Sequence, residues 1–279
     1  MKGFFNLGNT CFMNAGLQMI MNNNDITNTI LNTKSNNKFI IILKEFIKAY
    51  KDNKIDQPLN PTFIKKEISK MNTNFVGFRQ NDSDEFLHYF LDYINNIIGN
   101  NVIDKLFTIK INNIIKCKVM KCLHKRNNYE NSVKLELDVD DNIDNMDDLY
   151  KNMKKSFLLE DNNMVLCEKC KKKRISSKKI KILEWPNNLI IHIKRFKIKG
   201  NRYIKFCKDI IIPYEWRHDY YLKGFIYHSG SLSGGHYVYF GKYNNNWYLF
   251  NDNSVKKVDI NNINSFKNKS YIFYYKKIY

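Results

Sequence analysis

Apolar residues recur at helical spacing through the first hundred positions of the chain. The clearest case runs from Ser83 to Ile98, where apolar side chains fall at i, i+3 and i+4 and Gly99 then ends the pattern. Residues 12–21 are predicted to be helical because Asn9 or Thr10 could cap a helix there, and helical spacing predicts further helices over residues 39–50 and 61–71. A proline stands at the start of the last of these, where its missing N–H costs nothing.

From residue 106 onward the pattern changes to short runs rich in β-branched and aromatic residues. These runs predict strands over residues 106–111, 133–139, 180–183, 189–196, 204–212, 221–227, 236–243, 247–251 and 271–276, with an acidic helical stretch over 138–150. Helices followed by strands indicate an α+β fold, with an insertion near 106–183.

Composition narrows the class of protein further. Of the 279 residues, 43% are hydrophobic, which is enough for a buried core and excludes a disordered chain. No apolar run approaches the roughly 18 residues of a membrane span. Asparagines interrupt the apolar residues of the first twenty positions, so the sequence predicts neither a signal peptide nor a membrane protein.

The net charge of +19 raises the question of nucleic-acid binding. The basic residues are scattered, however, with one dense run at residues 169–174, and Asn, Lys and Ile are all abundant together. Such a joint excess is typical of composition drift. We therefore expect no nucleic-acid partner, and keep nucleic-acid binding as an alternative.

Six cysteines in a chain of this length do not form a disulfide scaffold. Cys11 stands alone at the start of a predicted helix, four others fall into two pairs, and Cys207 lies within a predicted strand and is expected in the core. This distribution favours a reducing, intracellular compartment. A lone cysteine such as Cys11 is by default a small buried hydrophobe, although a helix N-terminus stabilises a thiolate.

Two long motifs at opposite ends of the chain change that default. The first is GFFNLGNTCFMNAGLQ, residues 3–18; the second is GGHYV, residues 234–238, followed by WYLFND, residues 247–252. Together they resemble the cysteine and histidine boxes of the ubiquitin-specific proteases. QNDSDEFL, residues 80–87, and LEWPNNLIIHIKRF, residues 183–196, are similar to two further motifs of that family.

The resemblance covers essentially the whole chain and begins at Gly3, so it implies one catalytic domain over residues 1–279 without an accessory domain. It implies a papain-like cysteine protease fold of the ubiquitin-specific protease type. A helical thumb would span about 1–105, β fingers about 106–183 and a β palm about 184–279. Members of this family cleave the bond after the C-terminal Gly-Gly of ubiquitin.

The resemblance assigns catalytic roles position by position. Cys11 matches the nucleophile, His236 the base and Asn251 the residue that orients the imidazole. Its neighbour Asp252 is an alternative third member, because the family varies over which of the two acts. Asn6 matches the side-chain donor of the oxyanion hole, with the Cys11 backbone N–H as the second donor.

Gln80, Asp82 and Glu85 match the box that faces the arginine-bearing tail of ubiquitin. A capping box at a helix start is the competing interpretation of Asp82 and Glu85, and both can hold. Gly234 and Gly235 suit a channel too narrow for substrate side chains, because glycine lets two backbones approach.

Many members of the family bind structural zinc at the fingertips through two Cys-x-x-Cys pairs. Here Cys167 and Cys170 form an intact second pair, whereas Cys117 and Cys122 are separated by four residues. Zinc on these four cysteines and a metal-free, degraded fingertip both stay open, and His124 is another candidate for the fourth ligand.

The sequence thus predicts a thiol-dependent deubiquitinase that needs no cofactor for catalysis, acts as a monomer on ubiquitin or ubiquitinated proteins, and binds neither membrane nor nucleic acid. A catalytically weak ubiquitin-binding module and a protease for another ubiquitin-like modifier are the alternatives. His192 and His228 lie in strand patterns, and core or surface roles are expected for both.

Overall fold

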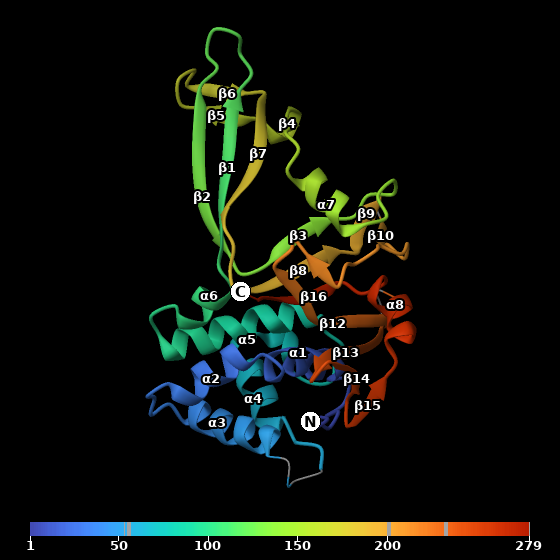
Figure 1. The fold of residues 1–279 in the computed structure, drawn as a ribbon. Coiled ribbons are helices and arrows are strands. Elements are labelled where there is room, and N and C mark those ends of the chain that lie inside the picture. Colours follow the sequence, from blue (N-terminus) through green and yellow to red (C-terminus); the bar gives the residue numbers. More distant parts are fainter. Residues whose placement is uncertain (53, 55–56, 200–201, 232–233, 279) are drawn as a thin grey trace.

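The structure, a computed structural model, describes the chain except for residues 53, 55–56, 200–201, 232–233 and 279 (Figure 1). Most of its helices precede the strands. The α-helices are α1 Cys11–Met21, α2 Asn24–Asn32, α3 Lys38–Lys51, α4 Thr62–Met71, α5 Ser83–Ile98, α6 Val102–Phe107, α7 Met146–Met153 and α8 Ile260–Lys267, with short 3-10 turns at Thr73–Phe75 and Asp161–Asn163.

The strands form two main sheets and two small hairpins. Their bounds are β1 Ile109–Cys117, β2 Lys125–Ser132, β3 Leu135–Asp138, β4 Phe157–Leu159, β5 Val165–Cys167, β6 Lys172–Arg174, β7 Ser176–Glu184, β8 Asn188–Lys194, β9 Phe196–Lys199, β10 Arg202–Lys205, β11 Glu215–Trp216, β12 Tyr220–Gly230, β13 Gly235–Tyr243, β14 Asn246–Asn251, β15 Ser254–Val258 and β16 Ile272–Lys277.

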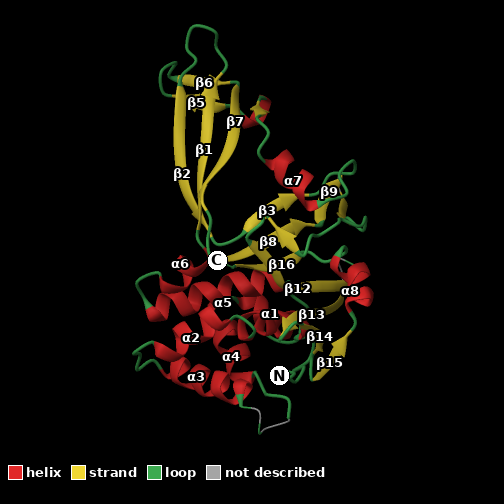
Figure 2. Cartoon of the chain, in the orientation of Figure 1, coloured by secondary structure: helices red, strands yellow, loops and turns green. Residues whose placement is uncertain are grey.

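The large sheet has the order β15-β14-β13-β12-β16-β8-β3, with β11 beside β12; β3 pairs with β8 in parallel, and the other pairs are antiparallel. The finger sheet, β2-β1-β7-β4, projects away from the helices, and the small β5-β6 hairpin lies at its far end (Figures 1 and 2). Helices α1 to α6 gather at the opposite end of the molecule, whereas α7 and α8 lie apart from them beside the strands (Figure 2).

Helix α1 lies between α5 and strand β13, and each of its residues is buried. Most of its side chains are apolar, as expected of a helix with neighbours on several sides, and its two polar residues, Asn14 and Gln18, are buried with hydrogen-bond partners. Gly16 lies against the Phe86 ring of α5, where a Cβ atom would come within 2.6 Å of the ring. This close approach fixes α1 against α5 and so fixes the position at which α1 begins.

The segment before α1 is tied to the large sheet. The Phe4 backbone N–H donates to the Asp252 carbonyl at 2.8 Å, and Phe4 also forms a parallel bridge with Leu59. The loop that leads into Cys11 is thereby held against the turn between β14 and β15, although some 240 residues separate the two in sequence.

The predicted α+β class is confirmed, and so are the helices over α1, α3, α4 and α5. The predicted strand at residues 106–111 is wrong at its start, because α6 continues to Phe107 and β1 begins at Ile109. The acidic stretch is helical over α7 alone. The division into one domain with three parts stays a prediction.

The predicted strand at residues 204–212 is also wrong. Strand β10 ends at Lys205, and residues 206–212 lie outside the named strands. Cys207 is exposed, not in the core. Buried Phe206, Ile210 and Ile212 supply the apolar character that suggested a strand, but here they anchor an irregular segment.

Candidate active site

Cys11 is the first residue of α1 and is buried. Its N-cap, Thr10, makes no capping hydrogen bond; the Thr10 hydroxyl instead accepts from Leu7 N at 2.8 Å and lies 3.2 Å from Asn6 Oδ1. The first N–H groups of a helix have no partner within it, so those at Cys11 stay available, and the helix dipole favours negative charge there.

His236 connects Cys11 to Asn251. Its Nε2 lies 2.7 Å from Asn251 Oδ1, an atom that only accepts, so Nε2 carries the proton and Nδ1 is left for the thiol. Hydrogen bonding to Cys11 is the largest of the causes that raise the pKa of His236 to about 9; burial opposes it, and Asn251 adds to it. This arrangement favours an imidazolium beside a thiolate.

The Asp252 carboxylate binds two side-chain amides, and its charge adds to the raised pKa of His236. Asp252 Oδ2 accepts from Asn6 Nδ2 at 2.9 Å and Asp252 Oδ1 from Asn14 Nδ2 at 2.7 Å. Asn6 Oδ1 in turn accepts from Thr10 N at 3.0 Å, so the Asn6 amide is held from both ends. The second N–H of that amide is the group available to a substrate oxygen.

The predicted substrate residues lie around one pocket of about 400 Å³. Gln80, Asp82, Glu85 and Gly234 line it together with Tyr237, and Gly235 is tied to it because its N–H donates to Gln80 Oε1 at 2.7 Å. The pocket thus carries two carboxyl groups in a chain of strongly positive net charge.

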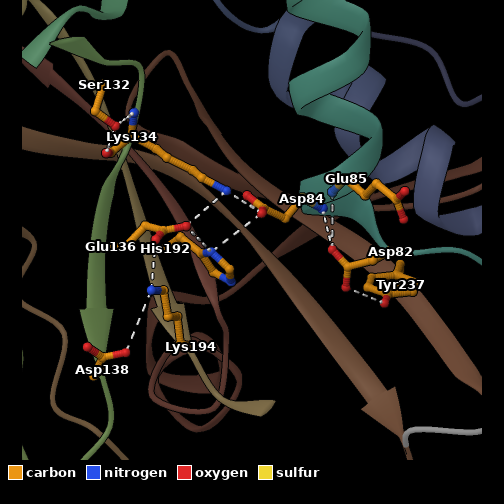
Figure 3. A network of polar contacts seen from close by, with 10 residues as sticks. All are labelled: Asp82, Asp84, Glu85, Ser132, Lys134, Glu136, Asp138, His192, Lys194 and Tyr237. Carbon is orange, nitrogen blue, oxygen red and sulfur yellow. Dashed lines mark hydrogen bonds and ion pairs between the residues drawn. The ribbon is translucent and has the colours of Figure 1, made fainter. Parts of the chain in front are cut away.

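Asp82 is the N-cap of α5 and accepts from the backbone N–H of Asp84 at 2.7 Å (Figure 3). Its other oxygen accepts from the Tyr237 hydroxyl at 3.1 Å. Burial and then the nearby Asp84 carboxylate raise the pKa of Asp82. Glu85 does not complete a capping box; its carboxylate lies 3.4 Å from the amides of Asn72 and Asn74.

A polar network beside Asp82 was not foreseen from the sequence. Lys134 contacts both Asp84 and Glu136, and His192 lies between the same two carboxylates at 3.5 and 3.8 Å (Figure 3). Lys194 then pairs with Glu136 at 2.8 Å. These residues come from α5, from β8 and from the segment that leads into β3. Only one feature of the sequence could have indicated the network: Lys134 and Glu136 are two positions apart, which places them on the same face of a strand.

Four cysteines meet at the end of the finger sheet. The Sγ atoms of Cys117, Cys122, Cys167 and Cys170 all lie within 4.8 Å of one another, with Cys122 and Cys167 at 3.6 Å. Tetrahedral zinc with Zn–S bonds of about 2.3 Å would hold thiolates roughly 3.8 Å apart. The donor set and spacing therefore fit a structural zinc ion, and the longer Cys-x4-Cys segment turns back tightly enough, with Cys122 N donating to Val119 O.

His124 is not a member of this cluster. Its Nε2 lies 3.5 Å from Glu168, beside Arg126, which contacts the same carboxylate. The four thiols thus provide a complete tetrahedral set, and the His124 alternative is not needed. The described residues include no helix long and apolar enough to cross a lipid bilayer.

A buried thiol at a helix start, an imidazole and a carboxamide, brought together by an α+β fold, form the arrangement typical of cysteine hydrolases. Residues 2–275 match the family described as ubiquitin carboxyl-terminal hydrolase, and the chain belongs to that family. The family relationship predicted from the motifs is confirmed.

Among its relatives, the chain is 28% identical to ubiquitin carboxyl-terminal hydrolase 16 of Arabidopsis thaliana over 94% of its own length and 29% of that protein. It is also 28% identical to a probable ubiquitin carboxyl-terminal hydrolase 16 of Schizosaccharomyces pombe, over 99% of its own length and 66% of that protein. The chain thus spans less than two thirds of the length of either relative.

The chain is also similar to the Ubp8 chain in a solved structure of the SAGA Ubp8/Sgf11/Sus1/Sgf73 DUB module bound to ubiquitin aldehyde. The TM-score is 0.85 at 20% identity, over 100% of this chain and 70% of the other. A second structure of that module, bound to monoubiquitin, gives a TM-score of 0.84 at 21% identity. These similarities confirm the predicted papain-like fold of the ubiquitin-specific protease type.

Proposed function

We propose that the chain is a deubiquitinase that hydrolyses the isopeptide or peptide bond after the C-terminal Gly-Gly of ubiquitin. The observation that carries this proposal is His236, which hydrogen-bonds to the Asn251 carboxamide and whose pKa is raised chiefly by Cys11, in a chain of the ubiquitin carboxyl-terminal hydrolase family. Ubiquitin as the modifier is supported by two structural neighbours that were solved with it bound.

In this mechanism the Cys11 thiolate attacks the carbonyl carbon of the last glycine. The carbonyl oxygen becomes an oxyanion that accepts hydrogen bonds from the Asn6 amide and the Cys11 backbone N–H. The C–N bond to the leaving lysine then breaks, and His236 gives its proton to the departing amine. Water, deprotonated by His236, hydrolyses the thioester and restores the thiol.

Asn251 orients the imidazole, and Asp252 acts one step away by holding Asn6. Both roles follow from the direction of their side chains: Asn251 Oδ1 faces His236, and the Asp252 carboxylate faces Asn6 and Asn14. We therefore assign the third catalytic position to Asn251. An amide in this position fixes the tautomer without adding a charge.

The substrate tail would enter past Gly234 and Gly235. A Cβ atom on Gly235 would collide with the His228 ring and the Ser229 carbonyl, so this position requires glycine. Asp82 and Glu85, on the pocket beside this wall, suit the arginine side chains of a basic tail through charge-assisted hydrogen bonds.

Around this activity we infer one domain that acts as a monomer, in a reducing intracellular compartment, without nucleic-acid or membrane binding. All six cysteines are free thiols, which supports such a compartment. Zinc at the fingertips would be structural and would take no part in catalysis.

The test is labelling by a ubiquitin probe with an electrophilic C-terminus, read as intact mass. Wild type is expected to gain one ubiquitin, Cys11→Ala none, and Cys207→Ala one, because Cys207 is an exposed thiol outside the site. Ubiquitin binding without labelling would replace this proposal by that of a catalytically weak binding module. Labelling by the probe of another ubiquitin-like modifier in place of ubiquitin would change the substrate.

A further inference from the structure

The hairpin that carries His236 extends beyond the strands on either side of it. Strand β12 pairs with β16 as far as Ile226, and β13 pairs with β14 from Tyr239 onward. Residues 227–230 and 235–238 therefore pair only with one another among the described strands. Both Gly235 and His236 lie in this projecting part.

The outer edge of β12 carries carbonyl groups that a neighbouring strand would normally bind. Ile226 O accepts from Tyr271 N at 3.3 Å, and because alternate carbonyls of a strand point to the same edge, those of His228 and Gly230 face the same way. Unpaired carbonyls at a half-buried edge are costly.

Lys205, the last residue of β10, binds both of these carbonyls. Its Nζ donates to His228 O at 2.9 Å and to Gly230 O at 2.8 Å, and lies 3.2 Å from His228 Nδ1. An ammonium group has three N–H donors, and three acceptors surround this one. The side chain thus takes the place of the missing strand.

The contact with Nδ1 also defines the state of His228. An ammonium group can donate only to an unprotonated ring nitrogen, so His228 is neutral with its proton on Nε2. Burial and then the charge of Lys205 lower the pKa of His228 to about 4. The neutral ring stacks on Tyr237 at 4.3 Å between centroids, and the Tyr237 hydroxyl donates to Asp82.

The opposite edge of the hairpin is held in the same way. Gly235 N–H donates outward to Gln80 Oε1 at 2.7 Å. Gln80, from the helical half of the molecule, thus binds the β13 edge of the hairpin, and Lys205, from β10, binds the β12 edge. His236, paired with Ser229, lies between these two attachments.

We propose that Lys205 is a positioning residue for the reaction: it binds the free edge of β12 in place of a strand and thereby fixes His236 relative to Cys11. Lys205 is not among the residues that line the substrate pocket. A base displaced by about 1 Å loses on the order of 100-fold in rate, so a small release of the hairpin end has a large effect. The part of this inference that concerns turnover rests on the proposed deubiquitinase activity.

The test compares Lys205→Met with Lys205→Arg. Methionine keeps the length of the side chain and removes its donors; arginine keeps charge and donors. Lys223→Met is the matched control, because Lys223 is half-buried on β12 itself but lines a separate pocket with Tyr243 and Lys242. Thermal unfolding is measured for all three variants.

The first readout needs no ubiquitin: it is the alkylation rate of Cys11 by iodoacetamide at neutral pH, followed on the Cys11 peptide by mass spectrometry. We expect Lys205→Met to lower this rate about 10- to 100-fold, because the imidazolium no longer sits beside the thiolate. Lys205→Arg is expected to keep most of the rate, and Lys223→Met all of it.

The second readout is turnover of a ubiquitin C-terminal fluorogenic substrate, in which kcat should fall and KM should change by less than about threefold. Equal alkylation rates of Cys11 in Lys205→Met and Lys205→Arg would overturn the proposal. A higher KM for the ubiquitin substrate in Lys205→Met, with an unchanged alkylation rate, would also overturn it. Slower alkylation of Cys11 in an enzyme that turns over no ubiquitin would support the positioning role while refuting the proposed function.

Discussion

Two adjacent residues at the end of β14 have different hydrogen-bond partners. Asn251 ends the strand and faces His236, and Asp252 has a φ of 49°, a left-handed backbone that turns its carboxylate toward Asn6. Asparagine and aspartate tolerate this conformation better than other non-glycine residues. The turn thus separates two roles that the sequence left open between these neighbours.

The separation predicts unequal effects of substitution. Asn251→Ala is expected to lower kcat about 100-fold, because the imidazole loses the partner that fixes its tautomer. Asp252→Asn keeps an oxygen that can accept from Asn6 and should cost about tenfold or less. Steady-state kinetics on a ubiquitin substrate measure both, and a larger loss in Asp252→Asn than in Asn251→Ala would reverse the assignment.

The pKa of His236 predicts a pH dependence. With a folded-state value of about 9 against an ordinary value of 6.5, the charged imidazole stabilises the fold fully below about pH 6.5, and this contribution is lost as pH rises through about 9. Since Cys11 is the largest cause, Cys11→Ala should move the pKa of His236 down toward 6.5.

An NMR titration of the His236 ring in wild type and Cys11→Ala measures this shift. His228, whose pKa burial lowers to about 4, is the internal control and should not follow. A wild-type His236 that titrates near 6.5 would contradict the thiolate–imidazolium arrangement.

At the scale of elements, the fingertip joins two hairpins that share little apolar surface. Cys117 and Cys122 flank the turn after β1, and Cys167 and Cys170 flank the turn between β5 and β6. Exposed apolar side chains such as Met120 and Leu166 lie around them. A metal ion bound by these four cysteines would replace a hydrophobic core at this end of the molecule.

Removal of the metal is expected to loosen the finger sheet while the active site stays formed. Cys122→Ser should lose a bound equivalent of zinc and unfold at lower temperature, whereas Cys207→Ser should change neither. Elemental analysis and thermal unfolding measure these effects. A chain purified from zinc-containing medium that holds no zinc, yet unfolds like Cys122→Ser, would favour the metal-free fingertip.

The errors in the predicted elements have a local cause. A run of a few apolar residues fits a helix turn, a strand or an irregular buried segment equally well. A long pattern such as that of α5 has enough repeats to distinguish a helix from a strand. Gly99 follows α5 with a φ of 76°, a backbone conformation that commonly ends helices. Residues 106–111 and 204–212 carry too few repeats, so their neighbours in space decided their form.

At the scale of the whole molecule, the network around Glu136 joins the helical half, the large sheet and the base of the fingers. His192, whose Nδ1 lies 3.8 Å from the Glu136 carboxylate, is the largest cause that lowers the pKa of Glu136, and Lys194 and Lys134 act in the same direction. The carboxylate faces these three groups, with Asp84 and Asp138 beside them. It is therefore a junction among three parts of the chain.

This junction predicts acid sensitivity. The folded-state pKa of Glu136 lies below its ordinary value of 4.5, so its stabilising contribution is present above that pH and is lost as pH falls below it. Glu136→Gln should unfold at lower temperature near neutral pH and lose less on acidification than wild type.

Melting temperatures between about pH 7 and pH 3 give the comparison. Glu184→Gln is the control, because Glu184 pairs with Lys110 on the surface and both side chains are at least half exposed. Parallel pH curves for wild type and Glu136→Gln would contradict the prediction.

The sequence by itself determined the fold class and the family, and it predicts the reactive groups. Motifs at residues 3–18 and 234–252 name Cys11, His236 and Asn251, because chemistry constrains residue type and spacing within a short segment. Long helical periodicity also determined α5, whose buried face repeats often enough to identify a helix from the sequence alone.

The tertiary structure alone decided which side chains meet. Neither the direction of Asp252, nor the convergence of four cysteines despite an irregular spacing, nor the Lys205 ammonium at the free edge of β12 follows from local pattern. Each depends on segments that lie tens to hundreds of residues apart in the sequence. Burial of apolar surface brings these segments together, and because that driving force is non-directional, it does not specify which polar side chains meet.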